Sequence, residues 1–203
     1  MEALPTEDRR TGRSMAKASR RAALLDAAAQ LFADRGYNGV SIEDLGAAAG
    51  VSGPAVYRHF PGTPSVLSAL LTGVSEDLLE GGRAVAAGAS SPEEALRGLI
   101  RFQVEFALNN ADVIRVQDRD LASLAHDDGR TVRSLQRGYV QVWVDELARH
   151  LPDTDRSMLR RKVHAVFGLI NSTPHTTHGT TSSRELAALR DLLQDMAWAA
   201  LTA

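Results

Sequence analysis

The side chains best suited to chemistry stand together at Tyr57, Arg58 and His59. A phenol, a guanidinium and an imidazole all donate hydrogen bonds, and the guanidinium carries a permanent positive charge. Such groups bind phosphates and the edges of nucleic-acid bases. No nucleophile-elbow motif, phosphate-binding loop or cluster of metal ligands accompanies them in the sequence. The pattern therefore favours binding over catalysis, and we expect no enzymatic activity, no cofactor and no metal site.

These three residues close the stretch SIEDLGAAAGVSGPAVYRHF, which has the pattern of two short helices joined by a tight turn. Ser41 can cap the first helix, and Asp44 has the position of a capping-box acid. Gly50 follows the last periodic residue, where a left-handed conformation ends a helix at little cost. Ser52 is expected to cap the second helix, with Pro54 in its first turn. This is the plan of a helix-turn-helix DNA reader, whose second helix enters the major groove.

Residues 21–67 resemble the N-terminal domain of the tetracycline-repressor (TetR/AcrR) family of bacterial regulators. The matching residues run in order along this segment: Ala28, Leu31, Phe32, Gly36, Tyr37, Ser41, Ile42, Ala48, Gly50, Val51, Ser52, Tyr57, His59 and Phe60. The family commonly has a lysine three residues after the phenylalanine, where this chain has Thr63 followed by Pro64. The resemblance therefore does not extend to one phosphate contact, and Thr63 is expected to cap the next helix instead.

The resemblance implies a DNA-binding surface on this head. It assigns the groove-facing front to the start of the second short helix, and phosphate contacts to Ser41, Tyr57 and His59. Arg58 can reach a phosphate or a guanine edge. The residues expected to contact DNA are Arg20, Arg21, Tyr37, Ser41, Ser52, Gly53, Pro54, Ala55, Tyr57, Arg58 and His59. Packing alone is the alternative role for Tyr37, Tyr57 and His59.

Composition limits the classes that remain. Of the 203 residues, 44% are hydrophobic, which is enough for a packed core. The absence of cysteine excludes disulfides, thiolate metal sites and a cysteine nucleophile. The first residues lack the apolar stretch of a signal peptide, and no run approaches the roughly 18 apolar residues of a membrane span. We therefore expect a cytoplasmic protein.

The charge is unevenly distributed. The net charge of −2 does not indicate nucleic-acid binding, but residues 1–21 hold six basic residues against three acids. A basic arm can contact phosphates or the minor groove. We expect residues 1–18 to form a disordered basic arm. Arg20 and Arg21, at the start of the first helix, are expected to contact DNA, whereas a solubilising tail is the alternative for the arm itself.

Helical spacing of apolar residues continues to the C-terminus, and neither a strand pattern nor a repeat is evident. The first helix is expected over Ser19–Arg35. A fourth opens at Pro64 and runs to about Leu78, before loop signals at Gly81-Gly82. We expect an all-α fold of about nine helices, with a helix-turn-helix head over 19–63 and a ligand-binding and dimerisation bundle over 64–203.

The eighth helix, about Thr154 to Asn171, ends in a run that is apolar nearly all round. Such a helix is buried on several sides, and we expect one side to meet a second subunit. The residues expected at this interface are Val163, Val166, Phe167, Ile170, Leu189, Leu193 and Ala197. The following connector holds His175 and His178, which lack a third metal ligand and are expected to lie in a surface loop.

A ligand site is expected inside the bundle. Its aromatic residues can line an apolar cavity, with arginine at the mouth to meet an acidic ligand. The residues expected to line it are Phe102, Phe106, Arg115, Arg119, Trp143, His164, Phe167 and Asn171. The alternative role for the aromatic residues is packing in the core. For Arg119 and its two aspartate neighbours, the alternative is a solvated cluster. For His164, it is a core histidine whose hydrogen bonds are satisfied.

The runs VIRVQDRDLASL and FGLINSTPH resemble sensors of actinobacterial lipid catabolism that bind acyl-CoA thioesters. The family resemblance as a whole implies a homodimer that binds a pseudo-palindromic operator and represses transcription until a small effector enters the body. The expected effector is apolar or of the acyl-CoA type, with an aromatic or drug-like molecule as the alternative. A helical small-molecule-binding module without a DNA role is the alternative function, but it would leave Tyr57, Arg58 and His59 unexplained.

Overall fold

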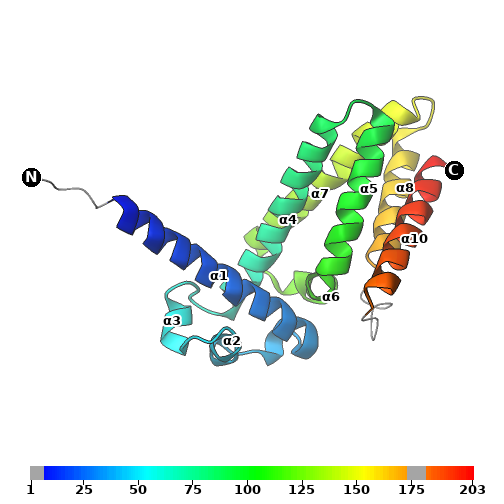
Figure 1. Cartoon of the computed structure of the whole chain (residues 1–203). Helices are drawn as coiled ribbons and strands as arrows, with labels where there is room; N and C mark the ends of the chain where they lie inside the picture. The colour runs from blue at the N-terminus through cyan, green and yellow to red at the C-terminus, as the bar shows by residue number, and fades with distance from the viewer. Residues whose placement is uncertain (1–6, 173–181) are drawn as a thin grey trace, which may run out of the picture.

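The computed structural model describes residues 7–172 and 182–203. These residues form nine α-helices and contain no strand, which confirms the all-α prediction. A small group of helices at the N-terminal end forms a head, and the remaining helices form an elongated body above it (Figure 1). His175 and His178, and with them the expected surface loop, lie outside the described residues.

The head contains three α-helices and one 3₁₀ turn: α1 (Glu7–Arg35), the 3₁₀ helix η1 (Tyr37–Gly39), α2 (Ile42–Ala48) and α3 (Gly53–Tyr57). The first helix begins at Glu7 rather than at Ser19, so it takes in much of the expected disordered arm. The remainder of that arm, residues 1–6, lies outside the described residues. α1 is therefore a long rod, and the buried residues of its C-terminal half pack into the head (Figure 1).

The body begins with α4, which leads out of the head, and continues with helices packed side by side. Its elements are α4 (Thr63–Gly88), α5 (Pro92–Asn109), α6 (Ala111–Asp120), the 3₁₀ helix η2 (Leu121–Ser123), α7 (His126–His150), α8 (Arg156–Ile170) and α10 (Ser183–Thr202). Gly62, not Thr63, caps α4, and Pro64 lies in its first turn. Ser91, Asp155 and Ser182 cap the following helices with side-chain oxygens that accept backbone N–H groups.

Gly81 and Gly82 lie inside α4 and do not end it, contrary to the expected loop. Their role is to make room for two rings. A Cβ on Gly81 would lie 2.3 Å from the ring of Phe102, and one on Gly82 would lie 2.4 Å from the ring of Tyr139. The missing side chains thus let α5 and α7 pack directly on the α4 backbone, which compensates for the low helix propensity of glycine.

Two hydrophobic clusters form the core. One fills the body, and the other fills the head and includes apolar residues of α4, α6 and α7. Val113 and Val116 of α6 and Val132 of α7 are buried against the head residues. The head therefore shares its core with the body and is not a separate globule.

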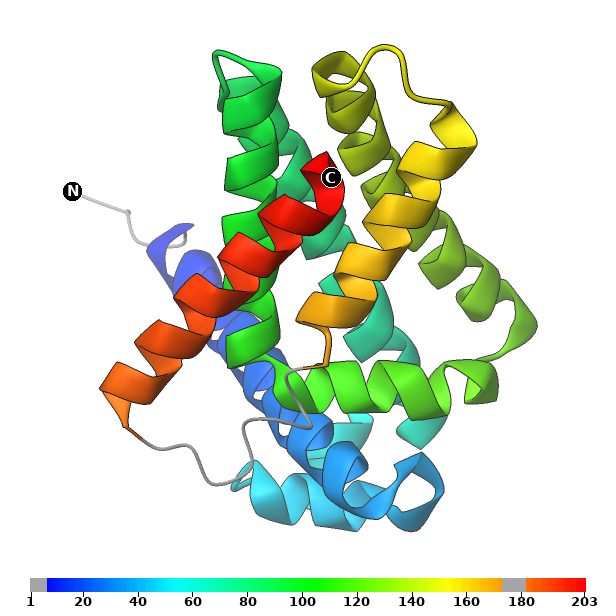
Figure 2. The same ribbon diagram turned by 90° about the vertical axis from the view of Figure 1, so that its right-hand side faces the viewer.

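Most residues expected at the dimer interface are buried within a single chain. Val163, Val166, Ile170, Leu193 and Ala197 all belong to the core of the body. Phe167 and Leu189 are half-buried against that core. The reason is that α8 and α10 pack on each other and on α5 and α7, so the chain itself covers the inner faces of both helices. Figure 2 shows the two helices side by side on one outer surface of the body.

In the described part of the chain, no helix is both long and apolar enough to cross a lipid bilayer.

A Gly82→Ala substitution tests the close packing of α4. The new methyl group would overlap the buried ring of Tyr139, and overpacking of this kind costs about 1–3 kcal/mol of unfolding free energy. The matched control is Gly73→Ala in the same helix, where no atom lies within 4 Å of the new Cβ. The control should be neutral or gain up to about 1 kcal/mol from helix propensity. Urea unfolding measures both, and equal effects would contradict this account of α4.

Candidate nucleic-acid interface

The start of α2 is fixed by a capping box. Ser41 N donates to Asp44 Oδ2 at 2.9 Å, and Asp44 N donates to Ser41 Oγ at 3.1 Å. The Ser41 hydroxyl also donates to Asp44 Oδ2 at 2.6 Å. These hydrogen bonds hold the pKa of the Asp44 carboxyl below its ordinary value, with the Ser41 side chain as the largest cause. The predicted capping box is confirmed, and it commits much of the Ser41 side chain to structure.

The turn between α2 and α3 depends on backbone geometry. Gly50 has φ 68°, in the left-handed region that favours glycine, as predicted. Gly46 faces the turn, and a Cβ there would lie 2.8 Å from the Val51 carbonyl oxygen. Ser52 precedes α3 as predicted, but its side chain makes no capping hydrogen bond. Its exposed hydroxyl can therefore bond to a group outside the chain.

One face of α3 is anchored in the head and the other is exposed. Val56 and Phe60 are buried, and the Arg21 guanidinium carbon lies 5.2 Å from the centre of the Phe60 ring. Opposite them, Tyr57 keeps 53% of its surface exposed, and Arg58 is exposed beside it. The helix therefore presents a phenol and a guanidinium to solvent from a fixed base.

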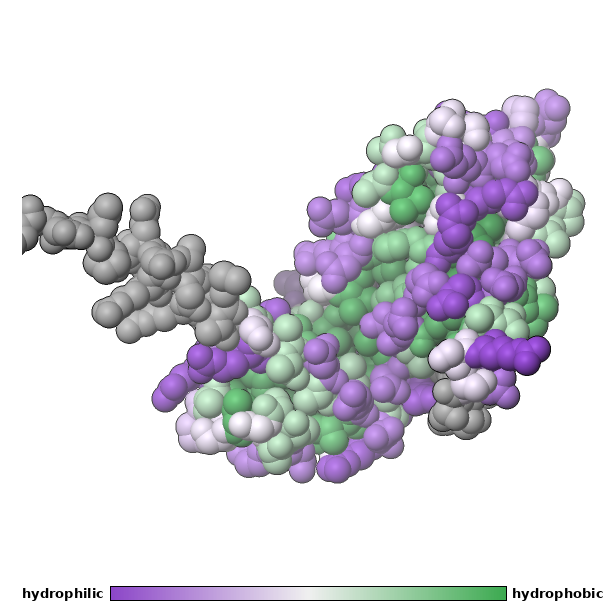
Figure 3. All heavy atoms as spheres, in the orientation of Figure 1, coloured by the Kyte–Doolittle hydropathy of each residue, from purple (hydrophilic) through white to green (hydrophobic). Residues whose placement is uncertain are grey.

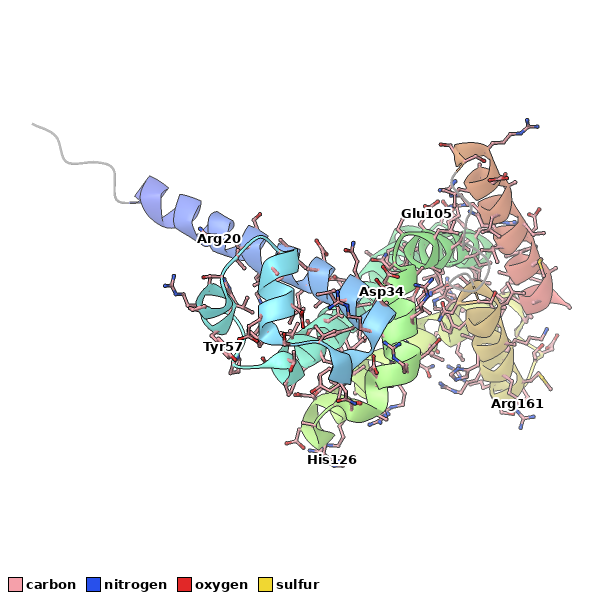
Figure 4. All side chains as sticks on the ribbon, turned by 90° about the horizontal axis from the view of Figure 1, so that it is seen from below. Arg20, Asp34, Tyr57, Glu105, His126 and Arg161 are labelled. Carbon is pink, nitrogen blue, oxygen red and sulfur yellow. The ribbon has the colours of Figure 1, made fainter. Side chains whose placement is uncertain are left out.

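The other residues expected to contact DNA surround this face. Ser52, Pro54, Arg20 and Arg21 are exposed, and Gly53, Ala55 and His59 are half-buried. Tyr37 is half-buried, and its ring meets that of Phe32 edge-on at 5.7 Å, so packing accounts for much of its surface. In Figure 4, Arg20 and Tyr57 lie on the same side of the view, far from Arg161 of the body. The structure thus gathers these residues on the head.

Arg119, expected at the ligand site, instead joins the body to the head. From the end of α6 its guanidinium donates to the carbonyl oxygens of Phe32 and Ala33, the latter at 3.2 Å. It also pairs with the buried carboxylate of Asp120 at 2.9 Å, and this hydrogen bond raises the pKa of Arg119. The Phe32 carbonyl also accepts from the Gly36 N–H at 2.9 Å, and carbonyls at a helix C-terminus carry partial negative charge. Arg119 therefore holds the C-terminal end of α1 against α6.

The interior of the body holds a polar chain within an aromatic cluster. The Tyr139 hydroxyl donates to Gln103 Oε1 at 3.1 Å, and Gln103 Nε2 donates to Asn171 Oδ1 at 3.0 Å. The Phe167 ring lies 5.0 Å from that of Trp143 and 5.5 Å from that of Tyr139. Burial raises the pKa of the Tyr139 phenol, so this hydroxyl stays neutral. Here α5, α7 and α8 meet in an uncharged, hydrogen-bonding environment.

The remaining residues expected to bind ligand are dispersed. Phe102 and Phe106 line a groove of about 390 Å³ between α4 and α5, where Figure 3 shows an apolar band. Arg115 pairs with Asp112 at 2.9 Å on the surface of α6. His164 is exposed between α7 and α8. Only Trp143, Phe167 and Asn171 of the expected set meet at the interior polar chain.

A larger groove of about 700 Å³ lies at the junction of α1, α4 and α6. It shares Val74, Asp77, Asn109 and Asn110 with the α4–α5 groove. The two grooves thus adjoin along α4, from the body to the head.

Gln103 and Tyr139 are the interior residues that the sequence did not mark as functional. Gln103 is a buried amide on the otherwise apolar inner face of α5, four residues after the buried Leu99. A polar side chain at a core position of a helix indicates an internal hydrogen-bonding site, because buried polar groups require partners.

Both parts of the chain match family models. Residues 24–70 match the model described as "Bacterial regulatory proteins, tetR family". Residues 89–194 match the model described as "Tetracyclin repressor-like, C-terminal domain". The two matches cover most of the head and most of the body.

Individual proteins that resemble this chain are regulators of the same kind as the two family models. The HTH-type transcriptional repressor KstR2 of Mycolicibacterium smegmatis is 30% identical, over 67% of this chain and 67% of that protein. A TetR-family regulator from Bordetella parapertussis superposes with a TM-score of 0.76 at 26% identity, over 87% of this chain and 93% of that one. FadR from Bacillus subtilis, solved with stearoyl-CoA, shares the fold with a TM-score of 0.67 at 15% identity, over 86% and 96% of the two chains.

Replacing Arg119 with alanine should weaken the junction between head and body. The change removes the Arg119 donor from the Ala33 carbonyl and one of the two donors from the Phe32 carbonyl, and it leaves the buried Asp120 carboxylate without its cation. Unpaired buried groups cost about 1–3 kcal/mol of unfolding free energy. Arg130→Ala, which breaks an exposed ion pair with Asp127, is the control and should change stability by less than about 0.5 kcal/mol. Thermal unfolding measures both, and equal small losses would remove Arg119 from this role.

Proposed function

The chain belongs to the tetR family of bacterial regulatory proteins, and from this we propose that it is a ligand-responsive repressor that binds a pseudo-palindromic operator as a homodimer. The observation that carries the proposal is α3, a short helix anchored by Val56 and Phe60 that exposes Tyr57 and Arg58. A helix held in this way can enter the major groove while neighbouring residues contact phosphates. A ligand-binding module without a DNA role would not account for this surface.

The outer faces of α8 and α10 support the dimer. Met158 on α8 and Leu192 and Met196 on α10 are large apolar residues with 45–53% of their surface exposed. Gly168 of α8 is exposed, and a Cβ added to it would meet no atom within 4 Å, so a second helix can approach closely there. Two copies related by a two-fold axis would bury these residues against each other and present two α3 helices about one turn of DNA apart or a multiple of it.

The interior of the body supports an apolar effector with a neutral polar group. Gln103, Tyr139 and Asn171 form an uncharged hydrogen-bonding chain, bordered by the rings of Trp143 and Phe167. A carbonyl can insert into such a chain, whereas a carboxylate would lose its hydration without meeting a positive charge. The thioester of an acyl-CoA satisfies this requirement, and FadR from Bacillus subtilis was solved with stearoyl-CoA.

Arg119 and α4 provide a route from the effector to the DNA. Phe102 and Tyr139 lie directly on α4, and Arg119 links α6 to the end of α1. An effector that moves these rings favours another position of the head, and coupling of this kind typically changes affinity by about 1–3 kcal/mol. The proposed role is regulation in the cytoplasm, where DNA is available, and not catalysis.

An Arg58→Ala substitution tests the DNA surface. A lost phosphate or guanine contact costs about 1–3 kcal/mol, so affinity should fall roughly tenfold or more without loss of stability. The probe is a duplex that the unaltered protein selects from a random pool, and fluorescence anisotropy measures the affinity. Arg83→Ala, an exposed position on α4, is the control of equal charge. Equal affinities for the two variants would exclude Arg58 from the contact surface.

A Leu192→Asp, Met196→Asp double variant tests the dimer. Two carboxylates on the outer face of α10 would have to be desolvated at the interface, so the protein should become monomeric while keeping its helical content. Light scattering after size exclusion measures the mass, and circular dichroism measures the fold. Tyr57→Asp, which changes an exposed apolar residue of the head, should remain dimeric. A dimeric double variant would move the interface elsewhere.

A further inference from the structure

A groove of about 280 Å³ lies between α7 and α8, away from the interior polar chain. Its lining comes from both helices: Arg133, Gln136, Arg137, Val140, Arg160 and His164. On α7 these positions recur every three or four residues, and on α8 the two are four apart, so each helix turns one face to the groove. The lining is therefore a surface that both helices build together.

The groove concentrates positive charge. In the part of the chain that the structure describes, Arg133, Arg137 and Arg160 have no carboxylate within ion-pair distance. Arg160 donates to the Gln141 amide oxygen, which is neutral. By contrast, Arg130, before the groove on α7, pairs with Asp127. Guanidinium groups that have no carboxylate partner are free to bind the oxygens of an anion that enters the groove.

The groove also offers donors in excess. The amide nitrogen of Gln136 is fully buried and has no hydrogen-bond partner within the described chain. Guanidinium groups only donate, and the His164 imidazole can donate as well. Buried donors without acceptors are rare in native proteins and call for an explanation. A ligand rich in acceptor oxygens, with negative charge, matches the guanidinium groups, and a turn of the Gln136 side chain would bring its amide nitrogen to the same ligand.

We propose that the α7–α8 groove binds a phosphorylated small molecule, whose phosphate oxygens accept from Arg133 and Arg137, and from the Gln136 amide once that side chain has turned toward the groove. Arg160 and His164 close the site from α8, and Val140 supplies an apolar floor. The volume approaches that of small-ligand clefts, which begin near about 300 Å³, and so has room for more than one phosphate. Free phosphate and the nucleotide part of coenzyme A share this chemistry.

DNA is not the ligand that this groove fits. Arg161, the residue after Arg160 on α8, lies on the opposite side of the view from Tyr57 (Figure 4). A duplex held by α3 would therefore contact the other end of the molecule. The site is independent of operator binding, so the two proposals can fail separately.

Isothermal titration of the full chain at low salt tests the site, with inorganic phosphate and coenzyme A as separate probes. The test variant is Arg133→Gln, Arg137→Gln. The control is Arg130→Gln, Arg156→Gln, which removes the same charge from two exposed ion pairs outside the groove. Binding to the test variant should weaken at least about tenfold, since each lost bond is charge-assisted, and binding to the control should not change. A tighter fit of coenzyme A than of phosphate would identify a nucleotide-bearing ligand, and comparable affinities would identify phosphate itself.

Thermal unfolding supplies a second readout. Phosphate should raise the melting temperature of the unaltered protein and of the control, but not that of the test variant. Without phosphate, the test variant should melt close to the unaltered protein, because Arg133 and Arg137 are exposed surface residues. The selected DNA duplex should bind the test variant normally.

Four results would overturn the proposal. They are no saturable binding of either probe to the unaltered protein, equal weakening in test and control variants, loss of DNA affinity in the test variant, or binding that appears only after Leu192→Asp, Met196→Asp splits the dimer. The last result would show that the partner subunit covers the groove.

Discussion

The position of the DNA-reading helix depends on how the C-terminal end of α1 is held. There the Phe32 carbonyl accepts from the Gly36 N–H and also from Arg119 of α6, and the Ala33 carbonyl accepts from Arg119. α1 in turn forms one wall of the head core, in which Phe32 packs with Leu45 and Val56. A bond between α6 and a helix end thus determines where α3 points. Because the same core includes residues of α6 and α7, the head cannot turn without disturbing the body.

Local rules allowed the head to be predicted well from the sequence. The capping box of Ser41 and Asp44 and the left-handed Gly50 involve residues a few positions apart, and short-range spacing is what a sequence shows directly. The contacts that escaped prediction are long-range. Arg119 binds backbone carbonyls of another helix, and no side-chain pattern marks a carbonyl as an acceptor. Gly81 and Gly82 suggested a loop because their partners, Phe102 and Tyr139, come from distant helices.

The expected interface residues show a related limit. An apolar run on α8 predicted burial on several sides, and the burial is real, yet α5, α7 and α10 of the same chain provide it. The spacing of apolar residues along a helix predicts that one face is buried, but it does not show whether the same chain or a second subunit covers that face. The same limit applies to the polar chain of Gln103, Tyr139 and Asn171. A single amide on an apolar helix face predicts that it has a hydrogen-bond partner, but the sequence does not identify that partner. The helices themselves could be predicted from the sequence, whereas the pairing of their faces required the fold.

The glycine pair in α4 has a consequence for the evolution of this scaffold. Because the α4 backbone itself is the wall on which two rings rest, the space directly above Gly81 and Gly82 is filled by ring residues of α5 and α7. Exchange of Phe102 or Tyr139 for a smaller side chain would open space beside α4 without any change in α4 itself. A substitution of one ring residue can therefore change which small molecules fit beside α4, while the helix that joins the body to the DNA-binding head keeps its sequence.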